Sequence, residues 1–93
     1  MIIFRINDKT NREIRLTKIG WKHISREHPK INIEEIKNTL TSPDIIKPSI
    51  YDPKNVKWYY KFDKNKKRYI MVSVKYLNNE GFIITAFYVN KIR

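Results

Sequence analysis

The chain has 93 residues, of which 20 are Lys or Arg and 9 are Asp or Glu, so its formal net charge is +11. This length predicts one domain over residues 1–93, and the basic excess favours an anionic partner such as nucleic acid. Cysteine is absent, which excludes disulfides and cysteine nucleophiles. No apolar run reaches the roughly 18 residues of a membrane span. We therefore expect a cytoplasmic protein that does not bind a membrane.

The N-terminal half of the sequence predicts two short extended segments followed by two helices. Residues 1–6 and 13–16 are the extended segments, and they can pair as a small hairpin. Thr17 can cap a helix over 18–27, which should end near His28 because the residue before a proline disfavours helix. Asn32 and Glu35 have the spacing of a capping box, which predicts a second helix over 33–40.

The C-terminal half has a β pattern. Residues 56–62, 67–77 and 81–90 predict three antiparallel strands. The sequence 78–81 favours a type I turn followed by Gly81 in the left-handed region, and this register places Lys75 directly across from Thr85. The predicted fold is α+β, with N-terminal helices packed on one face of an antiparallel, roughly four-stranded sheet.

Several polar and aromatic residues are candidates for chemistry. His23 and His28 lie on and just after the first helix, and imidazole titrates near neutrality, so the pair could act as general base and general acid. The alternation of the strand 56–62 places Tyr59 outward, where its ring could stack on an unpaired base. Lys61 follows it, and the basic turn that ends at Arg68 suits phosphate contacts. Two histidines without cysteine predict neither a metal site nor a cofactor.

The order of these motifs resembles the phage-associated branch of the barnase, EndoU, colicin and RelE-like nuclease superfamily. The similarity is carried by Leu16-Thr17, Gly20-Trp21 with His23, Arg26 with His28-Pro29, Thr39-Leu40 with Pro43-Asp44, Tyr59-Tyr60, Val72-Ser73-Val74-Lys75 and Gly81 to Phe87. The resemblance implies helices on a four-stranded antiparallel sheet and metal-independent cleavage of RNA to a 2′,3′-cyclic phosphate. It implies His23 or His28, together with Lys75 and Thr85, as catalytic residues, with Arg26 as an additional phosphate ligand.

The predicted partner is RNA, most simply single-stranded. Its predicted contacts are Arg26, Tyr59, Lys61, Arg68 and Tyr88. The alternative is a non-catalytic, basic nucleic-acid-binding module of the same fold, because Lys30 and Phe87 stand where relatives often have a carboxylate and a phenol. A third interpretation is a toxin or effector whose partner is an acidic inhibitor protein or the ribosome.

Overall fold

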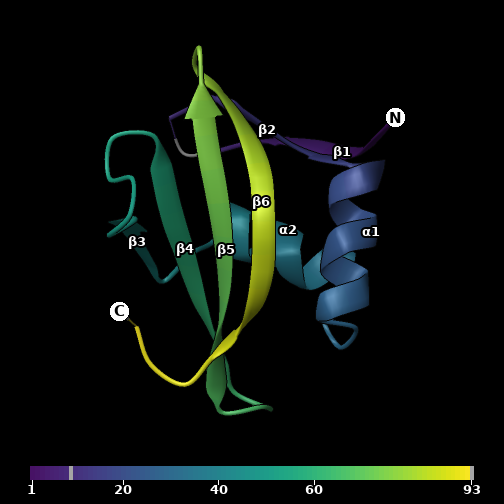
Figure 1. Ribbon diagram of the computed structural model, residues 1–93. Coiled ribbons are helices and arrows are strands. Elements are labelled where there is room, and N and C mark those ends of the chain that lie inside the picture. Colours follow the sequence, from purple (N-terminus) through teal and green to yellow (C-terminus); the bar gives the residue numbers. More distant parts are fainter. Residues whose placement is uncertain (9, 93) are drawn as a thin grey trace.

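A computed structural model describes residues 1–8 and 10–92 as a six-stranded mixed sheet with two short helices (Figure 1). In chain order the elements are β1 (Ile2–Asn7), β2 (Glu13–Thr17), α1 (Lys18–Glu27), α2 (Ile33–Thr41), β3 (Ile45–Pro48), β4 (Val56–Asp63), β5 (Arg68–Leu77) and β6 (Glu80–Val89). The strand order across the sheet is β1-β2-β6-β5-β4-β3. All neighbouring strands are antiparallel except β2 and β6, which are parallel.

The predicted sheet of roughly four antiparallel strands is wrong in two respects. The N-terminal hairpin β1–β2 joins the main sheet through Ile14↔Gly81 and Arg15↔Phe82, and this parallel pairing makes the sheet mixed. The unpredicted strand β3 pairs with β4 at the other edge, so the sheet has six strands. The two short helices follow this hairpin in the chain. The fold is a mostly-sheet α+β arrangement, in which Ile14 and Leu16 of β2 are buried in the same core as the helices.

Both helices begin and end where their local chemistry predicts. The Thr17 hydroxyl accepts the Gly20 N–H at 3.0 Å, and α1 ends before Pro29. The Asn32 side chain accepts the Glu35 N–H at 2.8 Å, while Glu35 Oε1 accepts the Asn32 N–H at 3.2 Å. The predicted capping box is thus confirmed, and it fixes the start of α2.

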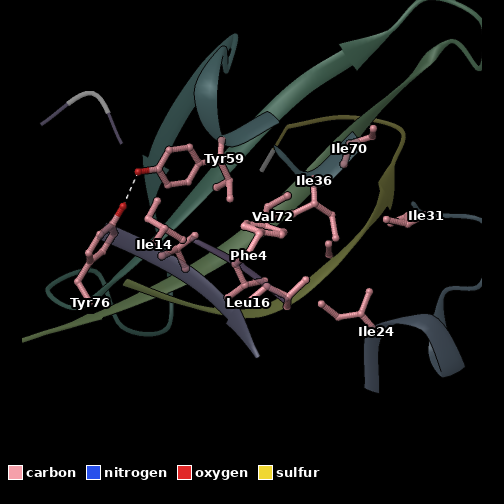
Figure 2. Packing of buried hydrophobic residues seen from close by; sticks show 14 residues of the cluster. Phe4, Ile14, Leu16, Ile24, Ile31, Ile36, Tyr59, Ile70, Val72 and Tyr76 are labelled. Atoms are coloured by element: carbon pink, nitrogen blue, oxygen red, sulfur yellow. Dashed lines mark hydrogen bonds between the residues drawn. The ribbon is translucent and has the colours of Figure 1, made fainter. Parts of the chain in front are cut away.

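The helices cover one face of the sheet and leave the other without helical cover (Figure 1). The main core lies under the helices and draws on both helices and five strands (Figure 2). Its buried members are Phe4, Ile14, Leu16, Ile24, Ile31, Ile36, Leu40, Tyr59, Ile70, Val72, Val74, Tyr76, Ile83 and Ala86. We call the sheet face without helices the open face. A second, smaller cluster of Val56, Trp58, Tyr60 and Met71 lies there.

Gly81 allows β2 to approach β6 closely. A Cβ atom at this position would lie 3.0 Å from side-chain atoms of Ile14, Tyr76 and Val74. These three side chains are buried, so they have little room to move aside. Gly81 does not have positive φ, and its predicted role in a left-handed turn is therefore wrong. The residue serves close packing instead.

The turn between β5 and β6 is tighter than predicted. Asn78 and Asn79 both have positive φ, 53° and 66°, and Leu77 pairs with Glu80 across a two-residue loop. This is the geometry of a type I′ turn, which matches the right-handed twist of the strands and which asparagine tolerates. A further irregularity leaves Ile84 without a partner between Ile83↔Val74 and Thr85↔Ser73.

A buried polar chain connects the N-terminal hairpin to the main sheet. Asp8 Oδ2 accepts the Tyr76 hydroxyl at 2.9 Å, and the Tyr76 and Tyr59 hydroxyls lie 2.5 Å apart (Figure 2). Arg12 Nε lies 3.2 Å from the same carboxylate oxygen. Because each partner is buried or half-buried, the network holds the β1–β2 turn against β4 and β5.

Candidate functional site

A cleft opens where α1 ends beside the start of β5 and the end of β6. We call it the His28 cleft, and its lining residues are Glu27, His28, Pro29, Lys30, Ile31, Arg68 and Tyr88. The polar side chains come from the end of α1 and the residues that follow it, from the start of β5 and from the end of β6, which lie at the same level of the sheet. The cleft therefore contains an imidazole, a guanidinium and a phenol from distant parts of the sequence.

Tyr88 links the cleft to a carboxylate and a second cation. Its hydroxyl donates to Glu35 Oε2 at 2.7 Å and accepts a hydrogen bond from Lys66 Nζ. Lys66 Nζ also lies 3.5 Å from Glu35 Oε2, and the Arg68 guanidinium carbon lies 4.5 Å from the centre of the Tyr88 ring. Burial raises the pKa of Tyr88 more than Lys66 lowers it, so the phenol keeps its proton and remains a donor.

Glu35 has two roles in this arrangement. One carboxylate oxygen closes the capping box of α2, and the other faces Tyr88 and Lys66. Sequence reasoning identified only the first role, because the capping motif is local whereas Tyr88 lies 53 positions away. Lys66 was predicted only as part of a basic turn suited to phosphate contacts, and its contact with Glu35 was missed for the same reason. It belongs to the basic turn before β5, and only the fold brings it to Glu35.

The two histidines are not brought together as expected. His28 is half-buried, and its ring stacks on Phe87 of β6 with centroids 5.4 Å apart and planes at 28°. His23 is exposed on α1, where its Nε2 lies 3.5 Å from Glu27 Oε1. Arg26 is also exposed on α1 and does not line the cleft. Of these three residues, only His28 contributes to the cleft.

Lys75 and Thr85 are not opposite each other, so the predicted register is wrong. Lys75 pairs with Phe82, and Thr85 pairs with Ser73, because the loop has two residues and Ile84 is unpaired. Both side chains lie on the open face. Lys75 is seven positions from Arg68 along β5, roughly 23 Å at about 3.3 Å per residue. The structure therefore separates Lys75 from the His28 cleft by distance and by sheet face.

The remaining predicted RNA contacts differ in exposure. Tyr59 faces the main core and is only 3% exposed, so its predicted outward orientation is wrong. The rings of Trp58 and Tyr60 in β4 lie outside the main core, on the opposite face of the strand. Lys61 is half-buried, and its Nζ donates to the Ser42 carbonyl at 2.8 Å. It lines a second hollow that includes Glu35 and Lys64, so it lies on the same side of the protein as the cleft.

In comparisons with known proteins, no protein-family model, curated protein or solved structure matches this chain. Within residues 1–8 and 10–92, no three His, Asp or Glu residues are grouped so that they could hold a metal ion. In the same part of the chain, no helix has the length and apolar character needed to cross a membrane.

Proposed function

We propose that the protein is a metal-independent endoribonuclease whose reaction takes place in the His28 cleft. The observation that carries this proposal is the meeting of His28, Arg68 and Tyr88 in one cleft, with Glu35 and Lys66 bonded to the Tyr88 hydroxyl. An imidazole and a carboxylate are the proton-transfer groups that phosphodiester cleavage needs, and the two cations suit a phosphate. The net charge of +11 favours an RNA substrate.

The reaction is an attack of the ribose 2′-oxygen on its own phosphate. Glu35 takes the 2′-hydroxyl proton, the 2′-oxygen forms a bond to phosphorus, and the bond from phosphorus to the 5′-oxygen breaks. Protonated His28 donates its proton to that leaving oxygen. The products are a 2′,3′-cyclic phosphate and a free 5′-hydroxyl, so the atoms balance without an added reactant. Each protein group returns to its starting state when proton transfer through water restores it.

Arg68, Lys66 and Tyr88 would stabilise the charge that develops on the phosphoryl oxygens. The Arg68 Nε is buried and has no hydrogen-bond partner among residues 1–8 and 10–92, and the guanidinium lies over the Tyr88 ring beside the cleft. The pKa of Lys66 is raised, chiefly by its hydrogen bond to Tyr88, which keeps the ammonium charged. Lys75 and Thr85 have no part in this proposal because they lie on the open face.

The test is cleavage of single-stranded RNA in excess EDTA, with analysis of the product ends. Wild-type protein should give 2′,3′-cyclic phosphate ends. His28→Asn and Glu35→Gln should each lower the rate by about 10²- to 10⁴-fold, the usual contribution of a general acid or base. Glutamine can keep the capping hydrogen bond at position 35, so this variant should fold.

Two controls separate the cleft from the other candidate residues. His23→Ala and Lys22→Ala should cleave RNA at the wild-type rate, because both side chains are exposed on α1 and neither lines the cleft. Loss of activity in Lys75→Ala with full activity in His28→Asn would place the reaction on the open face instead. RNA that stays intact with wild-type protein but shifts on a gel would identify a non-catalytic binding module.

A further inference from the structure

The open face of the sheet contains a pocket lined mainly by aromatic side chains. We call it the aromatic pocket, and its lining residues are Tyr51, Trp58, Tyr60, Met71, Phe87 and Val89. Its volume is about 280 Å³, slightly below the roughly 300 Å³ at which pockets for whole small molecules begin. A flat group of one or two rings is therefore a better match to this pocket than a larger ligand.

Tyr51 lies at the mouth of the aromatic pocket. It is 81% exposed, although its ring contacts Trp58 edge-on with centroids 6.1 Å apart. Trp58, Tyr60 and Met71 are by contrast buried and form the floor. An exposed ring above a buried aromatic floor offers π-faces on which a planar group can stack.

The charges around the pocket favour an anionic strand. Lys47 pairs with Trp58 across β3 and β4, and Lys75 pairs with Val56 across β4 and β5, so both cations lie on the open face. Val56 lines an adjoining hollow that shares Tyr51, Trp58, Met71 and Phe87 with the pocket. The carboxylate that lines this hollow is Asp52. Lys47 beside the pocket and Lys75 beside the adjoining hollow suit a base with its flanking phosphates.

Phe87 connects the aromatic pocket to the His28 cleft. Its ring lines the pocket and also stacks on His28, with the two ring centroids 5.4 Å apart. A base in the pocket would thus be separated from the imidazole by a single side chain. The next phosphate of the same strand could then reach the edge of β6 where the cleft begins.

We propose that the aromatic pocket holds one unpaired nucleobase of single-stranded RNA, next to the phosphate that the His28 cleft acts on. The inference rests on the proposed function for its link to cleavage, but binding in the pocket is measurable by itself. A paired base has both faces covered by its neighbours in the duplex, so it cannot enter. The pocket would therefore restrict the enzyme to unpaired RNA.

The experiment uses Trp58 as its reporter. The chain has two tryptophans, and Trp21→Phe leaves only the one in the pocket. The probe is a single-stranded 2′-O-methyl oligouridylate, which lacks the 2′-hydroxyl nucleophile and cannot be cleaved by this reaction. We expect saturable quenching of Trp58 fluorescence by the single strand, and none by the same strand in a duplex with oligoadenylate.

Two neighbouring variants provide the matched comparison. Tyr51→Ala should weaken binding about 10-fold through loss of base stacking, whereas Ile50→Ala should bind as wild type. Ile50 is 64% exposed in the same loop but does not line the pocket. Equal effects of the two variants, or binding without any change in Trp58 emission, would overturn the proposal.

Other occupants give different results, each of which overturns the proposal. Uridine monophosphate that quenches as strongly as the oligonucleotide would indicate a free nucleotide. A concentration-dependent dimer that Tyr51→Ala abolishes would indicate a second copy of the chain. Failure of the proposed function is distinct: quenching by the uncleavable strand together with intact natural RNA would reject cleavage and keep the pocket.

Discussion

Asp8 is a buried carboxylate with an unusually complete set of hydrogen bonds. Its Oδ1 accepts from Thr10 N, Thr10 Oγ1 and Arg12 N at 2.8, 2.7 and 3.0 Å. Its Oδ2 accepts from Tyr76 and lies near Arg12 Nε. Burial by itself would raise the pKa of Asp8, but these donors together outweigh it and hold the pKa below its usual value. The ionised form is thus favoured by folding.

This shift makes part of the stability dependent on pH. The stabilisation by ionised Asp8 is fully present above the pKa of about 3.9 that Asp has in the unfolded chain. It is lost as the pH falls through the lower pKa that Asp8 has in the folded protein. Asp8→Asn should lower the free energy of unfolding by about 1–3 kcal/mol at pH 7. It should also lose less stability than wild type between pH 7 and pH 3. Urea unfolding at both pH values measures this.

The matched control for Asp8 is Glu27→Gln on the exposed side of α1. Its carboxylate is about half exposed and its partner is His23, so we expect a change within about 0.5 kcal/mol. Equal losses of stability in Asp8→Asn and wild type between pH 7 and pH 3 would show that protonation of Asp8 does not cause the loss of stability in acid.

The β5–β6 turn makes a prediction at the level of an element. Asn79 has a φ of 66°, a conformation that glycine adopts freely and that costs alanine about 1–2 kcal/mol. Asn79→Gly should therefore be at least as stable as wild type, and Asn79→Ala should be less stable than the glycine variant by about 1–2 kcal/mol. Thermal unfolding of the three proteins compares them. Equal stability of the glycine and alanine variants would contradict a type I′ turn.

Local signals in the sequence were sufficient to predict most of the elements. Thr17 and the Asn32–Glu35 pair set the helix starts, Pro29 set the end of α1, and alternation located β4, β5 and β6. The turn at 78–79 was mispredicted because glycine two positions later also suits a longer loop. A change of loop length moves every cross-strand pair, which is why Lys75 was assigned the wrong partner.

The candidate site was predicted only in part, because most of its contacts join distant residues. His28, Arg68 and Tyr88 were proposed separately from their chemistry, and the fold brings them to one cleft. Glu35 was predicted only as a capping residue, so its contact with Tyr88 was not expected. For Tyr59 the alternation of β4 was right, but the assignment of its two faces was reversed, because apolar side chains occupy both sides of this central strand.

The whole molecule is strongly basic, and this predicts a marked salt dependence of RNA binding. The logarithm of the affinity for single-stranded 2′-O-methyl oligouridylate should fall linearly with the logarithm of salt concentration, by about 0.7 per phosphate contact. Arg68→Gln should reduce the slope by about 0.7, whereas Lys18→Gln, exposed at the start of α1, should leave it unchanged. Fluorescence titration at several salt concentrations measures both slopes. An unchanged slope in Arg68→Gln would remove this residue from the phosphate contacts.

The parallel pairing of β2 with β6 also affects how the chain folds. Ile14 and Arg15 meet Gly81 and Phe82, so this pairing closes a loop that contains more than half of the polypeptide. Contacts of such long sequence separation are slow to form, because the entropy of closing the loop is lost before the contacts compensate for it. During synthesis on the ribosome, the β1–β2 hairpin would leave the exit tunnel before β6, and the edge of β2 would have no strand to pair with until β6 follows.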